Sequence, residues 1–281
     1  GNPMIFALLL SAAPLLSTQD PVETPPPKKE FARLNGLQAK TAQEDLVALR
    51  RAEKEEARAE VRLRLIGYGE GLVPSVFDAA AQAVEAGRFG DLDTVLDSVL
   101  ADADLHLAWK LVKKKTPDEL RTYLVRRWSD SSREDVKDFL LPLLKDPSSA
   151  IAYQAGRGLL RRGHEEGAPA VFEAFRTRWT KEAATLRADF AGLERGPLAS
   201  LPREPLSSNK LQERLLGLRL FELFGVKEQA KLLLPMLSES DTSLRLAAID
   251  ACRAVIEGAP PLEKPSMTQI IEEAEAWKKK L

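Results

Sequence analysis

The stretch LLPMLSESDTSLRLAAIDACRAV, residues 233–255, decides the fold, because its apolar and small residues recur at intervals of three and four. This spacing indicates an α-helix and excludes the two-residue alternation of a strand. Leu244, Ala248 and Cys252 follow one another at steps of four. A small side chain one turn into a helix, such as Ala248, lets a neighbouring helix pack closely.

The same spacing occurs in three other places: Ala57, Val61 and Leu65 lead to Gly69, Ile151, Ala155 and Leu159 lead to Gly163, and Glu213, Gly217 and Phe221 lead to Gly225. In the frame of residues 244–256, Ile256 replaces the final glycine. Glycine suits a helix end because it adopts the left-handed conformation freely. A new apolar helix follows each short turn, and helix pairs that recur in register predict an α-solenoid.

These segments resemble HEAT repeats of the short bacterial kind. The likeness is clearest over roughly 55–80, 134–178 and 211–256, and it includes LLPLLKDPSSAIAYQAGRGLLRRGHEEGAPAVFEAF, residues 140–175. Asp241, Leu244, Arg245, Ala248 and Ala251 match the family's turn aspartate, aliphatic–arginine pair and spaced alanines. The resemblance implies an all-α solenoid of antiparallel helix pairs. We expect Arg58, Arg214 and Arg245 to tie neighbouring repeats through acidic turns.

Proline-rich segments divide the helical body. Residues 30–193 form an N-terminal block, residues 194–209 a proline-rich connection, and residues 210–281 a C-terminal block, so we expect two arms. One long helix is expected from Ala168 to about Ala191, and a capping helix from Thr268 to Leu281. The patterns Thr41–Glu44 and Thr116–Glu119 predict helix starts with capping boxes.

The N-terminus predicts export. Residues 4–16 are a short apolar run, too short to span a bilayer and typical of a secretory signal, so residues 1–18 are predicted to be a signal peptide. The alternative is an amphipathic or buried N-terminal helix. Residues 19–29 hold four prolines and predict an extended linker, or alternatively a proline-rich ligand. We therefore expect a periplasmic or extracellular protein with no membrane span after signal removal.

Composition excludes several classes of function. The net charge of −1 argues against a nucleic-acid-binding protein. Cys252 is the only cysteine and there are only two histidines, His106 and His164, so an intrachain disulfide and cysteine- or histidine-rich metal centres are excluded. No nucleophile elbow or phosphate-binding motif is present. The aspartates at 91, 93, 97, 102 and 104 lack the glycine of a calcium loop and predict a solvated helix face. We expect no metal, no cofactor and no catalysis.

The favoured function is a protein-interaction scaffold that grips another exported protein on its concave face. Tryptophan, tyrosine and arginine dominate interface hot spots. The candidate protein-binding residues are Tyr123, Arg126, Arg127, Trp128, Arg161 and Arg162. For the basic residues the simpler explanation is a favourable position near the C-terminus of their own helix. The alternatives are an enzyme or enzyme accessory like the bilin-lyase relatives of HEAT proteins, and a structural spacer of the cell envelope.

Overall fold

The computed structural model describes residues 30–281 and confirms an all-α protein. This part of the chain holds fourteen α-helices and no strand. The predicted signal peptide, residues 1–18, and the predicted linker, residues 19–29, lie outside the described residues. The helices are α1 (Gly36–Arg51), α2 (Glu55–Ile66), α3 (Val73–Glu85), α4 (Phe89–Val99), α5 (Leu105–Lys110), α6 (Asp118–Asp130), α7 (Val136–Leu143), α8 (Ser149–Leu160), α9 (Ala168–Asp189), α10 (Arg203–Leu206), α11 (Leu211–Phe224), α12 (Leu234–Leu237), α13 (Thr242–Cys252) and α14 (Met267–Lys280).

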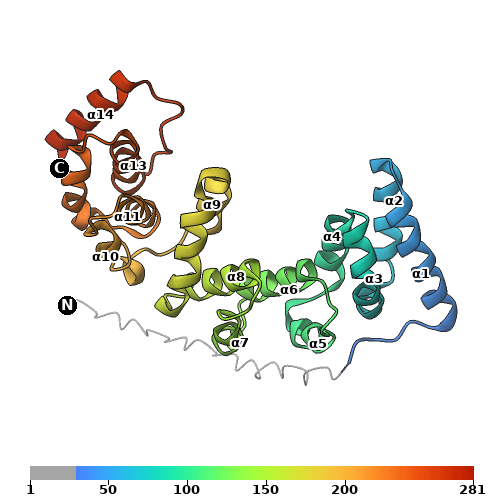
Figure 1. Cartoon of the computed structure of the whole chain (residues 1–281). Coiled ribbons are helices and arrows are strands. Elements are labelled where there is room, and N and C mark those ends of the chain that lie inside the picture. The colour runs from blue at the N-terminus through green and yellow to red at the C-terminus, as the bar shows by residue number, and fades with distance from the viewer. Residues whose placement is uncertain (1–29) are drawn as a thin grey trace, which may run out of the picture.

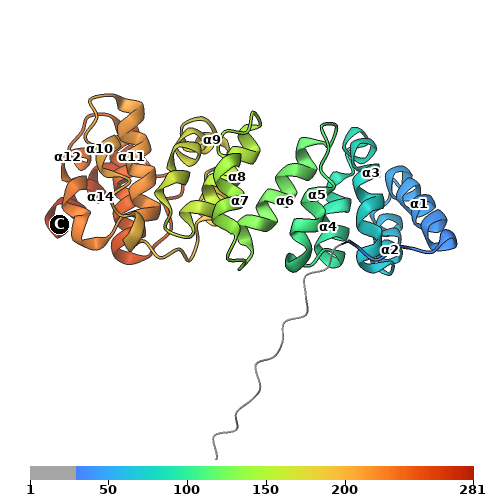
Figure 2. The same ribbon diagram turned by 90° about the horizontal axis from the view of Figure 1, so that it is seen from below.

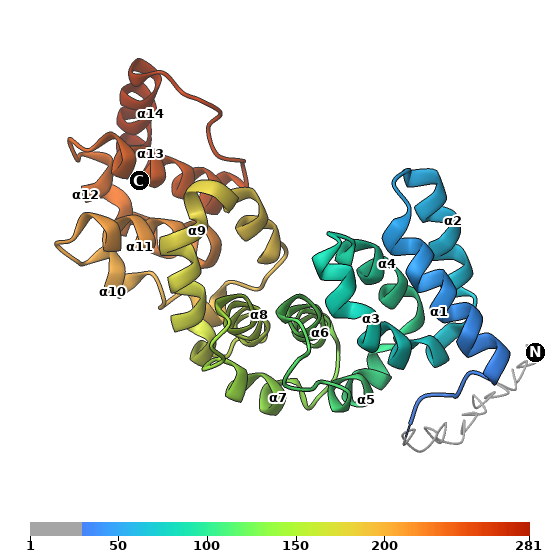
Figure 3. The ribbon, with the colours of Figure 1, turned by 45° about the vertical axis from the view of Figure 1, so that its right-hand side comes forward.

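The helices follow one another along a curved row in chain order (Figure 1). Seen from below, the row runs from α1 at one end to α14 at the other (Figure 2). α4, α6, α8 and α9 border the hollow side of the curve, whereas α5 and α7 lie on its outer side (Figures 1 and 3). We call the hollow side the inner side.

Consecutive helices on the two sides form antiparallel hairpins. Lys137, at the start of α7, pairs with Glu166, just beyond the end of α8, at 3.0 Å. In the first hairpin, Arg64 near the end of α2 pairs with Asp45 of α1 at 2.9 Å. The outer helix of each of these hairpins therefore runs opposite to its inner partner.

The inner helices run in one direction. Arg127 lies near the end of α6 and donates to the carbonyl of Leu100, which follows the end of α4, at 2.8 Å. Arg162 follows the end of α8 and donates to the carbonyl of Ser129, near the end of α6, at 2.7 Å. Since the ends of α4, α6 and α8 lie together, these three helices are parallel.

Glycines allow α8 to approach its neighbours closely. A Cβ atom built on Gly158 would lie 2.5 Å from Leu140 Cδ1 of α7 and 2.5 Å from Ser129 Oγ of α6. A Cβ on Gly156 would lie 2.6 Å from the carbonyl oxygen of Gly167. Side chains of any size are excluded at such distances, so α8 packs against three elements through its own backbone.

Two of the three glycines predicted to end helices adopt the left-handed conformation. Gly69 and Gly163 adopt left-handed φ angles of +61° and +75° beyond the ends of α2 and α8. Gly225 also lies at a helix end, but its φ of −66° is not left-handed. In the last frame Gly258, with φ +65°, ends the helix two residues after Ile256.

The capping predictions were wrong in detail. Thr41 lies inside α1, whose capping box is made by Asn35 and Gln38. α6 does begin at Asp118, but Thr116 makes no cap to it and instead accepts a hydrogen bond from the Lys113 N–H at 2.8 Å. The terminal helix is confirmed as α14, capped by Ser266 and Gln269.

The single long helix expected from Ala168 to Ala191 is wrong, because α9 bends sharply at Glu182, whose φ of −129° and ψ of 19° are not helical. The ring centroids of Phe175 and Phe190 lie 6.0 Å apart. A straight helix would separate residues fifteen positions apart by about 22 Å. The chain therefore reverses inside α9, as Figure 3 shows, and Ala168–Asp189 is itself a hairpin.

Residues 194–209 pack against both neighbouring parts of the chain. Leu198 is buried in one core with Tyr153 of α8 and Phe224 of α11. Leu206 belongs to the adjoining C-terminal core, and its backbone lies so close to α11 that a Cβ on Gly217 would meet the Leu206 nitrogen at 2.6 Å. Both faces of α11 are thus buried, one in each core. The division into two arms stays a prediction.

Candidate interaction surface

The two aromatic candidates lie inside the protein. Trp128 of α6 is 3% exposed and stacks on Phe139 of α7, with ring centroids 4.1 Å apart and planes at 18°. Tyr123 is 2% exposed, and its hydroxyl donates to Asp97 of α4 at 2.9 Å. Burial raises the pKa of the Tyr123 hydroxyl well above its ordinary value. Both side chains stabilise the contact between helices and are not available at the surface.

Three of the basic candidates cap the ends of other helices. Arg127 donates to the carbonyl of Leu100 at the end of α4. Arg162 donates to the carbonyls of Ser129 and Ser131 at the end of α6. Arg161 donates to the carbonyl of Asp189 at the end of α9 at 2.7 Å. The last carbonyls of a helix lack partners within it and carry partial negative charge. These cations therefore act on a neighbouring helix end, not only on their own.

Arg126 is the most accessible of the α6 candidates. Its side chain is 41% exposed, and its Nη2 lies 3.4 Å from Asp93 Oδ2 of α4. The second oxygen of Asp93 is buried and has no hydrogen-bond partner among residues 30–281. Burial raises the pKa of the Asp93 carboxyl to about 6, although the nearby Arg126 charge acts in the opposite direction.

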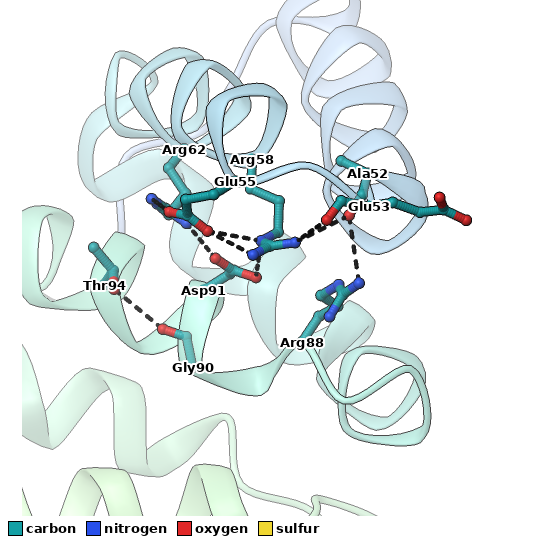
Figure 4. A network of polar contacts seen from close by, with 9 residues as sticks. All are labelled: Ala52, Glu53, Glu55, Arg58, Arg62, Arg88, Gly90, Asp91 and Thr94. Atoms are coloured by element: carbon teal, nitrogen blue, oxygen red, sulfur yellow. Dashed lines mark hydrogen bonds and ion pairs between the residues drawn. The ribbon is translucent and has the colours of Figure 1, made fainter.

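The aspartates of α4 and of the turn that follows it are not simply a solvated face, which corrects the sequence-based expectation. Asp91 is only 12% exposed and pairs with both Arg58 and Arg62 of α2 (Figure 4). Arg58 also donates to the carbonyl of Glu53 at the end of α1 at 2.6 Å. Arg58 therefore joins α2 to α4 through a carboxylate inside α4 and not through an acidic turn, and its role between neighbouring repeats stays a prediction. Aspartates 93, 97 and 102 pair in turn with arginines of α6.

Similar pairs continue along the inner helices. Arg157 of α8 is nearly buried and pairs with Asp130 of α6 and, at 3.6 Å, with Asp189 of α9. Beyond the bend of α9, Arg187 pairs with Glu222 of α11, with Nη2 and Oε2 3.0 Å apart. We call this series of ion pairs from α2 to α11 the inner ladder. Sequence reasoning missed its acidic members, because their partners lie about 25–35 positions away in the chain.

The two further arginines of the repeat pattern also act within the chain. Arg214 pairs with Glu239, and Arg245 donates to the Glu239 carbonyl at 3.1 Å. The predicted tie through the acidic turn before α13 is therefore present.

The residues considered for catalysis, Cys252, His106 and His164, lie among backbone and side-chain groups of the fold. Cys252 is fully buried, as predicted, and burial raises the pKa of its thiol to about 12. His106 Nδ1 lies 2.9 Å from the carbonyl of Ala103, and His164 Nδ1 lies 3.5 Å from Lys137 Nζ. Within residues 30–281, no three His, Cys, Asp or Glu side chains gather as a metal site would require.

Comparison with known proteins adds no family to this description, since no family model and no curated protein matches the chain. None of the helices between Glu30 and Leu281 has the length and apolar character needed to cross a membrane. The structure defines the class as an all-α protein of helix hairpins whose inner helices are joined by ion pairs.

Proposed function

We propose that the chain is a HEAT-type α-solenoid that acts as a non-catalytic scaffold and binds another protein along its inner side. The antiparallel hairpins and the parallel direction of α4, α6 and α8 support the solenoid part of the proposal. The resemblance of the sequence to HEAT repeats supports the same assignment.

The single observation that carries the binding proposal is the continuous row of inner helices around the hollow of the curve (Figure 1). A row of repeats offers a large surface without a deep pocket, and such surfaces suit protein partners. The inner ladder fixes neighbouring helices relative to one another, so that less conformational freedom is lost when a partner binds.

The partner surface would carry mixed charge. Arg126, Asp97 and Asp130 belong to the inner ladder and still have side chains between 41% and 53% exposed. Exposed charges of both signs favour a partner with complementary charges at matching positions and set the rate and specificity of association. The expected export of the chain, which rests on residues 1–18, makes the partner another exported protein.

Site-specific photocrosslinking tests the proposal. A photoreactive amino acid is placed at Arg126 on α6 or at Thr94 on α4, both on inner helices, and a matched control is placed at Asp138 on the outer helix α7. The proposal predicts one discrete protein adduct in cells at the inner positions and none at Asp138. Equal adducts at all three positions, or none at any, would contradict binding on the inner side.

A further inference from the structure

A groove lies between the two shortest α-helices of the described chain, α10 and α12, with the 3-10 helix η5 (Lys227–Leu233) along one side. Its volume is about 850 Å³, within the range of about 300–1,000 Å³ that ligand sites occupy. Figure 3 shows α10 and α12 at the outer edge of the curve, away from the inner helices. We call this the C-terminal groove.

Short outer helices leave the groove open. α10 and α12 each span four residues, whereas the outer helix α7 spans eight. Each short helix carries a proline, Pro205 or Pro235, which cannot donate a backbone hydrogen bond. α12 continues directly from η5, but α10 is a single turn beside α11, which has fourteen residues, and Arg214 of α11 lines the groove.

The base of the groove is apolar. Leu206 and Met236 line it and belong to the C-terminal core, with exposures of 5% and 6%. Leu232 stands at its edge and is 43% exposed. The exposed leucine and the apolar base together form a surface that an apolar side chain of a partner would cover.

The rim is basic and only partly neutralised. Arg203 and Lys231 line the groove and form no ion pair with any residue in 30–281. With its amide oriented so that both ends are satisfied, Gln229 accepts a hydrogen bond from Arg203 at 3.1 Å, which positions this cation without neutralising it. Arg214 pairs with Glu239, yet its Nε is buried without a partner in the part of the chain that the structure describes. Glu228 is the one acidic residue in the lining.

We propose that the C-terminal groove binds an acidic peptide segment of a partner protein that carries one large apolar side chain. The apolar side chain would cover Leu206, Met236 and Leu232, while carboxylates would lie near Arg203 and Lys231. A free inorganic anion would use the rim alone and leave the apolar base uncovered, so the combined surface favours a peptide. This site is separate from the inner side of the curve, and either proposal can fail without the other.

Fluorescence anisotropy with the full chain and short labelled peptides tests the inference. The probe is a peptide of aspartate, glutamate and serine around a single leucine, and it is compared with a leucine-to-serine peptide and with a lysine-based peptide of the same length. Only the first is expected to bind saturably, and an excess of inorganic phosphate should not displace it completely.

Matched variants locate the site. Lys231→Gln should weaken binding about two- to fivefold, the usual effect of one exposed charge pair, whereas Lys227→Gln, in the same helix but outside the groove, should have no effect. Leu232→Ser should weaken binding about three- to eightfold, whereas Leu211→Ser, at a similar exposure of 38%, should have none. Circular dichroism checks that all four variants are folded.

Several results would overturn the inference. Binding of the lysine peptide at equal strength, equal effects in both members of a matched pair, or no saturable binding of the acidic peptide would each do so. Complete competition by phosphate would reduce the groove to an anion site. A concentration-dependent dimer that Leu232→Ser abolishes would identify a second copy of the chain as the occupant.

Discussion

Replacing Gly158 by alanine tests the close packing of α8 on which the row of hairpins depends. The added methyl group would lie 2.5 Å from Leu140 Cδ1, 2.5 Å from Ser129 Oγ and 2.7 Å from Ser129 Cβ. Real Cβ atoms do not approach so closely. Leu140 can turn its Cδ1 away, but the Ser129 Cβ is fixed to the backbone, so α6 must shift outward. Ser129 also donates to the Gln154 carbonyl at 2.7 Å, and the shift would break this hydrogen bond.

The expected magnitude combines three contributions. Overpacking a well-packed core costs about 1–3 kcal/mol, and the lost hydrogen bond costs about 1 kcal/mol. Alanine in a helix interior recovers about 1 kcal/mol relative to glycine. The net loss in free energy of unfolding is about 2 kcal/mol, a substantial part of the roughly 5–15 kcal/mol that stabilises a domain.

Urea titration followed by circular dichroism measures this loss. Gly90→Ala in α4 is the matched control, because a Cβ at Gly90 would meet nothing within 4 Å among the described residues, and it should leave the free energy of unfolding unchanged or raise it by up to about 1 kcal/mol. Leu140→Ala should cost less in the Gly158→Ala background than in the wild type, since it removes one of the clashing atoms. A Gly158→Ala protein as stable as the wild type, or more stable, would refute the close packing.

Three further perturbations test other parts of the structure. Folding raises the pKa of Asp93 from 3.8 to about 6, so the folded state binds this proton more tightly and the free energy of unfolding falls as the pH rises through that window. Relative to the wild type, Asp93→Asn should therefore gain about 1–2 kcal/mol in free energy of unfolding between about pH 4 and pH 7. Urea titrations that show the opposite trend would contradict this. Arg157→Gln leaves partly buried carboxylates unpaired and should lower the free energy of unfolding by about 1–3 kcal/mol. Its control, Arg33→Gln, removes an ion pair whose side chains are 84% and 70% exposed, and it should lower that free energy by less than about 0.5 kcal/mol. Equal losses in the same titrations would count against the inner ladder. Cys252 is buried, and burial raises the pKa of its thiol to about 12. It should therefore react with a thiol reagent only after the protein is unfolded in urea. Rapid labelling of the native protein would show that the packing around Cys252 is described wrongly.

The helical repeat could be predicted from sequence because its signals are local. The four-residue steps through Ala155 and Ala248 correspond to buried positions on α8 and α13, and Gly163 takes the left-handed conformation expected of a helix end. The bend at Glu182 could not be predicted in this way. Residues 180–184, Thr-Lys-Glu-Ala-Ala, include neither glycine nor proline and contain good helix formers. Packing between Phe175 and Phe190 reverses the chain there, and such tertiary contacts override local preference.

The candidate surface was harder to predict than the fold. Its residue type predicts that Trp128 anchors a partner, but Trp128 also continues the four-residue step of Leu120 and Leu124, a signal that indicates burial. The roles of Arg127 and Arg162 depend on carbonyls 27 and 33 positions away, which no local pattern reveals. The expectation of partner binding stays a prediction for Arg126, Arg127, Arg161 and Arg162, whereas Tyr123 and Trp128 are buried. Arg126 is the α6 candidate best placed to meet a partner.

Small-angle X-ray scattering of the purified chain tests the central claim most directly, namely that the helices form an extended curved row with an open inner side. A compact globule of 281 residues would have a radius of gyration of about 19 Å. The curved row predicts a clearly larger value and an asymmetric distribution of interatomic distances with a long tail. A radius of gyration near 19 Å with a symmetric distribution would contradict the extended row and, with it, the proposed inner binding surface.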